Sequence, residues 1–152
     1  MKYQDFQVGM VITHPPVEVT EDEMLAFARQ YDPQWFHTDV EQAEHGRWEG
    51  LIGSGWLTCG LAMRMMTHAA LHDSEAFGSP GLTNLRWPHP VRPGDALRLE
   101  ATVESIRQSA SREDLGIVRW TWRMFNQHDK LVLELEVTTL FDLSATASRL
   151  PD

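Results

Sequence analysis

The sequence predicts an α+β fold in which a long central helix is wrapped by an antiparallel β-sheet. The longest helical candidate covers residues 54–71 and is apolar on nearly every face, which is typical of a helix buried inside a protein. After it, the chain changes to short extended segments separated by polar turns. A sheet wrapped around this helix would bury all its faces. We expect one domain over residues 1–152.

The N-terminal part predicts a short strand followed by a helix. Residues 6–13 indicate a strand with a kink at Gly9, which Pro15–Pro16 then ends. Thr20, with a glutamate three residues later, predicts a capping box. Apolar residues at helical spacing then continue to about Arg29.

A second short helix is predicted before the long one. The first helix ends at Asp32–Pro33, because the residue before a proline is disfavoured in a helix. Thr38 or Asp39 is suited to cap a short helix over residues 40–44. Ser54 is suited in the same way to cap the long helix.

The C-terminal part predicts three strands. Residues 97–103 and 131–141 alternate apolar and polar side chains, and residues 117–125 are rich in β-branched and aromatic ones. The polar segment 126–130 indicates an antiparallel hairpin between the last two strands. Arg92–Asp95 predicts a turn, with proline and glycine at its central positions.

Composition excludes several classes of function. A net charge of -9 and a pI near 5.2 argue against nucleic acid as the main partner. The single Cys59 and an N-terminus without a signal-peptide core predict a cytoplasmic protein, and no segment is apolar enough to span a membrane. His68 and His72 have the spacing of metal ligands, but no clustered third ligand joins them, so we expect no metal.

The polar segment 31–39 carries the candidate catalytic residues. Asp32 and His37 lie five residues apart across a proline turn that could bring their side chains together. A carboxylate and an imidazole facing one small molecule can share acid and base roles on a bound water. Trp35 and Phe36 would exclude part of the water and shift both pKa values. The spacing alone also fits a turn-forming aspartate and a helix-capping histidine.

The glycine-rich segment 50–56 leads into the long helix. Free backbone N–H groups at a helix start, with the positive end of the helix dipole behind them, suit a polarised carbonyl oxygen. The same glycines could equally serve only a tight turn and close packing.

Together these segments resemble the MaoC-like dehydratase family, which includes the R-specific enoyl-CoA hydratases. The resemblance covers nearly the whole chain in order and is strongest from Phe27 to Met66. The segments that carry it are Tyr31–Asp39, Gly50–Thr58, Arg92–Asp95, Gly116–Arg119 and Phe125–Gln127.

The resemblance implies a hotdog fold and at least a homodimer, with an acyl thioester such as an acyl-CoA in a tunnel along the central helix. It implies that Asp32 and His37 activate a water that adds to the β-carbon of an enoyl thioester. The Gly55 N–H would bond the thioester carbonyl. No metal or redox cofactor is implied, because the thioester supplies the acidity and coenzyme A enters only as part of the substrate.

This sequence departs from the family pattern at two places. In the family, Asn-Pro and one further residue precede the His. Here Pro33 directly follows Asp32, and Gln34, Trp35 and Phe36 fill the space before His37, so the Asp-to-His spacing of five is kept. The usual His before the helix glycine is Ser54. We expect Ser54, Trp35, Phe36 and Trp56 to contact the substrate.

Two other functions fit the same features. A hotdog thioesterase would direct water at the thioester carbonyl, and a carboxylate alone can serve that reaction, so the Asp32 and His37 pair favours a hydratase. A non-catalytic acyl-thioester binding module would need neither residue.

The phosphates of coenzyme A could be bound by three basic side chains, Arg86, Arg92 and Arg112.

Overall fold

The computed structural model describes residues 1–144. The sequence also predicts a frayed tail over Ser144–Asp152. Apart from Ser144, this tail lies outside the described residues. The elements in chain order are η1 (Tyr3–Asp5), β1 (Val11–Glu18), α1 (Glu21–Tyr31), α2 (Trp35–Thr38), α3 (Val40–Glu44), α4 (Gly55–Met66), η2 (Thr67–Leu71), β2 (Ala76–Arg86), β3 (Ala96–Gln108), β4 (Leu115–Phe125) and β5 (Leu131–Asp142).

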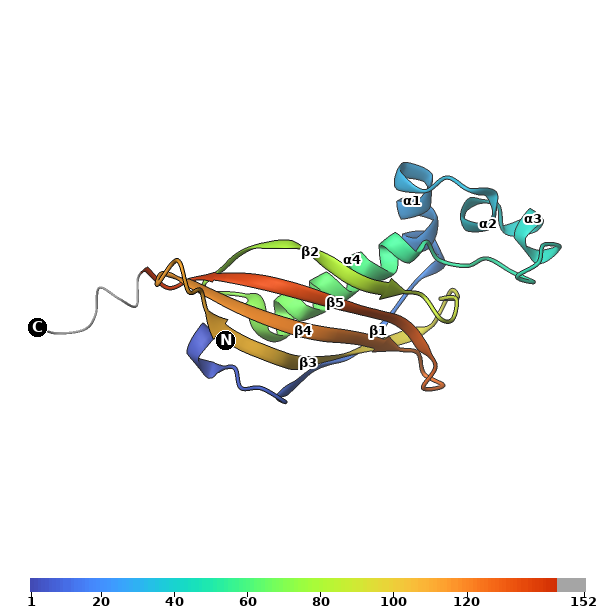
Figure 1. Ribbon diagram of the computed structural model, residues 1–152. Coiled ribbons are helices and arrows are strands. Elements are labelled where there is room, and N and C mark those ends of the chain that lie inside the picture. Colours follow the sequence, from blue (N-terminus) through green and yellow to red (C-terminus); the bar gives the residue numbers. More distant parts are fainter. Residues whose placement is uncertain (145–152) are drawn as a thin grey trace, which may run out of the picture.

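The five strands form one sheet in the order β1-β3-β4-β5-β2. Every neighbouring pair is antiparallel. Helix α4 and its π-helical continuation η2 run along the sheet, and α1, α2 and α3 gather at the end where α4 begins (Figure 1). The predicted α+β hotdog fold, with a long central helix against an antiparallel sheet, is therefore confirmed.

The hydrophobic core lies between α4 and the inner face of the sheet. Alternation along the strands turns one face inward and leaves the other in water. The outer face accordingly carries ion pairs, such as Arg123 with Glu134 across β4 and β5. The largest fully buried side chains are Met24, Met65, Met66, Leu97, Leu99, Trp120, Met124, Leu133 and Phe141.

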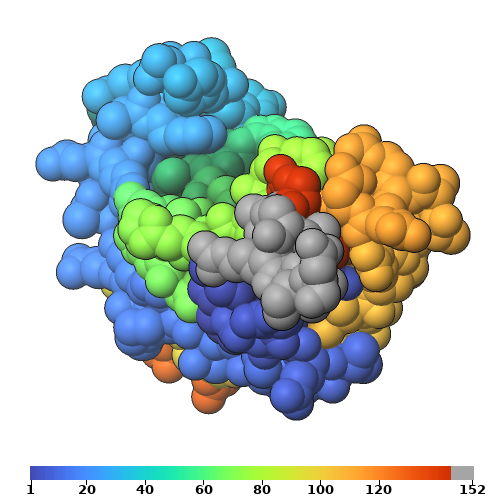
Figure 2. Space-filling model, turned by 90° about the vertical axis from the view of Figure 1, so that its left-hand side faces the viewer, coloured from blue at the N-terminus to red at the C-terminus, as the bar shows by residue number. Residues whose placement is uncertain are grey.

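Helix α4 is not covered on all faces, so that part of the expectation is wrong. Trp56 and Met63 are 57% and 45% exposed, and Gly60 between them is also exposed. The reason is that β1 and β2 are the two edges of the sheet and do not meet around the helix. In Figure 2 the green surface of α4 is set back between the blue N-terminal elements and the yellow-green β2.

Two strands differ from the sequence-based expectation because they lie at the edges of the sheet. Strand β1 begins at Val11 and continues through Pro15–Pro16, which was expected to end it. An edge strand needs ladder bonds on one side only, and the register of β1 against β3 shifts between His14 and Val17. Strand β2, which includes Pro80–Gly81, was not predicted as a strand and has three such shifts against β5.

The predicted helix caps are confirmed, with one difference. Thr20 accepts a bond from the Glu23 N–H, Asp39 caps α3, and Ser54 caps α4. The Glu23 side chain does not return to the cap residue. It lies 3.4 Å from the Arg64 guanidinium instead, so it links α1 to α4.

Candidate active site

Asp32 is fixed at the end of α1 by bonds from two other segments. It is the C-cap of that helix, and Pro33 prevents the helix from continuing. One carboxylate oxygen accepts a bond from the Ser54 hydroxyl at 2.7 Å, and the other accepts a bond from the Gln34 amide at 2.8 Å. The start of α4 and the residues after α1 therefore hold the carboxylate in one orientation.

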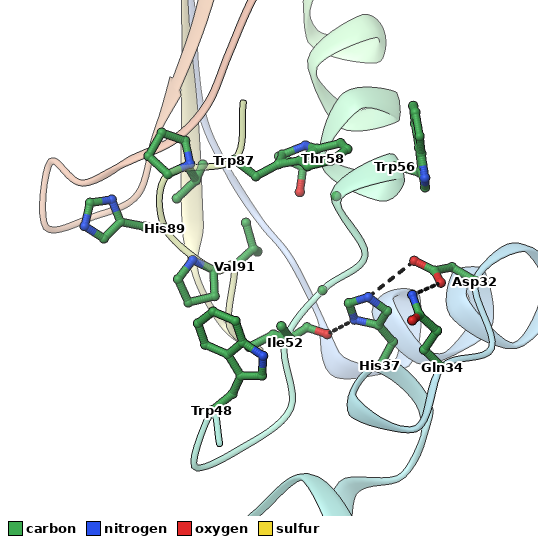
Figure 3. Close-up of a pocket in the computed structure, with 15 residues that line it drawn as sticks. Asp32, Gln34, His37, Trp48, Ile52, Trp56, Thr58, Trp87, His89 and Val91 are labelled. Carbon is green, nitrogen blue, oxygen red and sulfur yellow. Dashed lines mark hydrogen bonds and ion pairs between the residues drawn. The ribbon is translucent and has the colours of Figure 1, made fainter. Parts of the chain in front are cut away.

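His37 lies on α2, a short helical turn where the sequence suggested a loop. The side chain is buried, and its Nδ1 lies 2.7 Å from the carbonyl oxygen of Ile52. A carbonyl can only accept, so Nδ1 carries the proton and Nε2 is left free. Nε2 points at Asp32 Oδ2 from 3.3 Å (Figure 3).

The pair is arranged to hold one mobile proton. Burial raises the pKa of Asp32, but the hydrogen bonds from Gln34 and Ser54 and the charge of His37 outweigh it and lower the pKa below its usual value. The carboxylate therefore stays ionised at neutral pH. When the imidazole is neutral, Nε2 presents a lone pair to the carboxylate, and a proton or a water donor is needed between them. When it carries a second proton, Nε2–H faces Asp32 Oδ2 directly.

Backbone bonds hold the glycine-rich loop at the start of α4. Gly50 N–H donates to the Ala43 carbonyl, and Gly53 N–H donates to the Val91 carbonyl. These bonds fix the Ile52 carbonyl that orients His37. Within residues 1–144 the Gly55 N–H, the first of α4, has no hydrogen-bond acceptor. It is an unpaired donor at the positive end of a twelve-residue helix.

A cavity of about 310 Å³ joins these groups. The three residues expected to be catalytic, Asp32, His37 and Gly55, all line it, and its other walls are mainly aromatic and apolar (Figure 3). Its volume is at the lower end of ordinary ligand sites. The remaining lining residues are Gln34, Trp48, Ile52, Gly53, Trp56, Thr58, Trp87, Pro88, His89, Pro90, Val91 and Val132.

Of the four residues expected to contact substrate, one lines the cavity and three do not. Trp56 lines the cavity. Ser54 has no exposed surface and lies behind Asp32, which it bonds, so it positions the carboxylate and does not face the cavity.

Trp35 and Phe36 do not line the cavity. A Cβ placed on Gly46 would lie 2.7 Å from the Trp35 ring, so Trp35 packs on the loop after α3. The Phe36 ring lies against the His37 ring, with 4.4 Å between their centroids. Phe36 therefore packs against the imidazole, and neither side chain is among the residues that line this cavity.

Several lining residues were missed because they come from distant parts of the chain. Trp87 and His89 belong to the loop after β2, Val132 to β5 and Trp48 to the loop after α3. The one local feature that could have pointed to this wall was Trp87, next to the rigid Pro88-His89-Pro90 segment. Nothing in its spacing linked it to Asp32.

The three arginines suggested for phosphate binding have other partners. Arg92 donates to the Trp48 carbonyl at 2.6 Å and so braces the glycine-rich loop. Arg86 pairs with Glu134 on the outer face of the sheet. Arg112 pairs with Asp114 in the β3–β4 hairpin, at the end of the sheet opposite the start of α4, so within one chain it does not lie at this cavity (Figure 1).

The histidines at the end of α4 do not form a metal site with other side chains of residues 1–144. Across residues 1–144 no group of three His, Cys, Asp or Glu side chains is placed to hold a metal ion. His72 lies 3.3 Å from Asp73, and the His68 ring lies beside that of His14. In the same part of the chain, no helix has the length and apolar character needed to cross a bilayer.

Comparison with protein families matches the MaoC like domain to residues 5–120. The chain belongs to the MaoC-like dehydratase family. It is 29% identical over 140 residues to the uncharacterized protein YdeM of Bacillus subtilis, covering 92% of this chain and 98% of that one. It is also 29% identical over 102 residues to 3-hydroxyacyl-thioester dehydratase Z of Mycobacterium tuberculosis, covering 66% of this chain and 64% of that protein.

Solved structures of the MaoC-like family have the same fold. The MaoC-like dehydratase from Rhodospirillum rubrum has a TM-score of 0.84 and 34% identity, covering 91% of this chain and 94% of that one. The (R)-hydratase from A. caviae involved in PHA biosynthesis has a TM-score of 0.71 and 26% identity, covering 90% and 97%.

The lowered pKa of Asp32 predicts a pH-dependent contribution to stability. A carboxylate whose pKa is lower in the folded state stabilises that state above its unfolded pKa, and this contribution is lost as pH falls through the folded value. We expect the difference in unfolding free energy between the wild type and Asp32→Asn to shrink from pH 7 to pH 3. Urea unfolding across this range measures it, and a constant difference would contradict the assignment.

Proposed function

We propose that this protein hydrates a trans-2-enoyl thioester, or dehydrates the corresponding 3-hydroxyacyl thioester. The observation that carries the proposal is the juxtaposition of His37 Nε2, the Asp32 carboxylate and the unpaired Gly55 N–H around one cavity. Membership of the MaoC-like family and the likeness to a named 3-hydroxyacyl-thioester dehydratase support it.

In this proposal His37 moves the proton and Asp32 holds the charge. A water in the cavity donates to His37 Nε2 and to the Asp32 carboxylate, which leaves its oxygen lone pair free to attack the β-carbon. Nε2 takes the proton as the carbon–oxygen bond forms, and the ionised Asp32 stabilises the imidazolium. The same proton then passes to the α-carbon, so one water is added across the double bond and His37 returns to its starting form.

The Gly55 N–H stabilises the negative charge that develops on the thioester oxygen. As the β-carbon accepts the water, electrons move onto this oxygen, and a preplaced N–H donor at a helix start stabilises the resulting enolate. The thioester itself makes the α-proton acidic. The proposed reaction therefore uses no metal or redox cofactor, and coenzyme A is the carrier part of the substrate.

The test is to add the protein to short trans-2-enoyl-CoA substrates while following two signals. Hydration removes the conjugated enoyl absorbance and releases no thiol, which is the expected result. Release of free coenzyme A thiol without hydration would instead indicate a thioesterase. Tight binding with neither signal would indicate a binding module, and either of these two results would overturn the hydratase proposal.

We propose a second copy of this chain as the protein partner. Four large apolar side chains are exposed along the uncovered stripe of α4 and on β2, an eleven-residue edge strand. An exposed edge strand beside an apolar stripe favours association. A two-fold axis beside β2 would bury both features at once. The four side chains are Trp56, Met63, Phe77 and Leu82.

Leu82→Glu is expected to convert the dimer to a monomer, because it places a charge in the proposed interface. Analytical ultracentrifugation of both proteins at micromolar concentration measures the mass. Val8→Glu is a matched control, since Val8 is 66% exposed but lies before β1, away from β2. A wild type that is already monomeric would rule out this partner.

A further inference from the structure

Trp87 covers the first turn of α4. A Cβ built on Gly55 would lie only 2.4 Å from Trp87 Cε2, so the indole rests directly on this glycine. The Trp56 ring meets the indole edge to face, with 5.4 Å between centroids. The Trp87 side chain also lies close to the thiol of Cys59. Three contacts thus hold the indole across residues 55–59.

The indole closes one end of the catalytic cavity. Trp87 and Thr58 lie together there, at some distance from Asp32 and His37 (Figure 3). Thr58 and Val132 are fixed in the interior, with 2% and 0% of their surface exposed. Trp87 is 42% exposed and comes from a loop, so its removal disturbs the core less than the removal of Thr58 or Val132 would.

A second cavity of about 380 Å³ lies farther along the same helix. Its nearest α4 residue is Met63, eight residues and about 12 Å beyond Gly55 at the rise of an α-helix. Cys59, which lies close to Trp87, is between the two cavities along the helix. The lining is mainly apolar and consists of Met63, Thr67, Leu71, Ala76, Gly78, Ser79, Trp122, Val137 and Thr139.

We propose that Trp87 limits the acyl chain to a short one by separating these two cavities. The inference rests on the proposed hydratase function, since it concerns the substrate of the same site. From Gly55 to Cys59 the helix rises about 6 Å, which at about 1.5 Å per carbon–carbon bond accommodates a chain of roughly four to six carbons. A longer chain would have to displace the indole from Gly55, Trp56 and Cys59.

Removing the indole is expected to open the path to the second cavity. The experiment compares kcat/KM for trans-2-butenoyl-, hexenoyl-, octenoyl- and decenoyl-CoA in the wild type, Trp87→Phe and Trp87→Ala. The wild type should favour butenoyl-CoA and hexenoyl-CoA. In Trp87→Ala the value for decenoyl-CoA should rise by about 10-fold or more, the scale set by a few methylenes in an apolar pocket, and Trp87→Phe should fall between the two.

A second substitution identifies where the longer chain goes. In the Trp87→Ala background, Met63→Trp fills the second cavity and is expected to remove the gain on decenoyl-CoA while butenoyl-CoA turnover persists. Because Met63 also lies on the proposed dimer face, ultracentrifugation verifies that the variant keeps the mass of the Trp87→Ala protein. Thermal melting of each variant verifies folding, and Trp87→Phe serves if Trp87→Ala does not fold. The same measurements distinguish an error in the role of Trp87 from an error in the proposed hydratase function.

Wild-type turnover with the same chain-length profile in all variants would overturn the role of Trp87 and leave the hydratase proposal standing. Absence of turnover on every chain would overturn the hydratase proposal instead. In that case calorimetric binding of butanoyl-CoA and decanoyl-CoA to the wild type and Trp87→Ala decides the role of Trp87. Tighter binding of decanoyl-CoA only in the variant supports it, and equal binding in both proteins overturns it.

Discussion

His37→Ala is expected to lower kcat/KM for enoyl-thioester hydration by about 100-fold or more, the scale of a lost general acid–base group. The ring nitrogen that takes the proton from water is removed, and no other imidazole among the described residues bonds Asp32 or the Ile52 carbonyl. Asp32→Asn should cause a loss of similar scale, because the amide keeps the shape of the carboxylate but cannot stabilise an imidazolium. Enoyl absorbance measures both variants beside the wild type.

A matched control for this prediction is His45→Ala. His45 is exposed at the end of α3, bonds a backbone carbonyl of its own helix through Nδ1, and does not line the cavity. It should hydrate the substrate as fast as the wild type. Retention of more than about a tenth of the wild-type rate by His37→Ala would remove this residue from the proton-transfer role and redirect attention to Asp32 acting alone.

Gly55→Ala is expected to lower kcat/KM by about 100-fold, the scale of a lost oxyanion donor, and to destabilise the fold by about 1–3 kcal/mol, as overpacking does. The added methyl group would lie 2.4 Å from the Trp87 indole, so the ring or the start of α4 must move. Either movement displaces the N–H donor or narrows the cavity. Steady-state kinetics and urea unfolding measure the two effects.

Gly60→Ala provides the matched control on the same helix. Within one chain a Cβ at Gly60 meets no atom within 4 Å, so the substitution is free of clashes there. Because Gly60 lies on the stripe of α4 proposed as the dimer face, ultracentrifugation verifies that the variant keeps the wild-type mass. The substitution should leave turnover unchanged and raise the unfolding free energy by about 0.5–1 kcal/mol, the helix preference of alanine over glycine. If Gly55→Ala behaves like Gly60→Ala, the close packing of Trp87 on Gly55 does not matter for the reaction.

A double variant separates the two causes of the Gly55→Ala defect. Adding Trp87→Ala removes the indole that the new methyl group meets, so the combined destabilisation should be smaller than the sum of the single effects. If stability and activity both return relative to Trp87→Ala alone, the clash with the indole caused both losses. If stability returns but activity does not, the added methyl group itself impairs the reaction.

Features set by near neighbours in the chain could be predicted from the sequence. The caps at Thr20, Asp39 and Ser54 and the turn at Arg92–Asp95 depend on bonds within a few residues. The helix end at Asp32 depends on the proline that follows it. Edge strands were harder, because a proline that would interrupt an inner strand is tolerated where one side of the backbone needs no partner.

The candidate site was predictable in its polar part and not in its walls. Asp32 and His37 come together because a proline and one helical turn separate them, which is a local arrangement. Ser54 was found from its position, but its bond to Asp32 was not predicted, because the two residues are 22 apart in the chain. Trp35 and Phe36 were assigned to the cavity by proximity in sequence, yet the turn of α2 directs them elsewhere.

The sequence by itself therefore determined the fold class, the starts of α1, α3 and α4, the family and the pair of residues proposed for the chemistry. Only the tertiary structure decided which side chains surround that pair, how the His37 ring is oriented, and that Trp87 rests on Gly55. The physical reason is the range of the interactions. Caps, turns and short loops are stabilised by neighbours in the chain, whereas a cavity wall forms where loops from separate strands and helices are packed together.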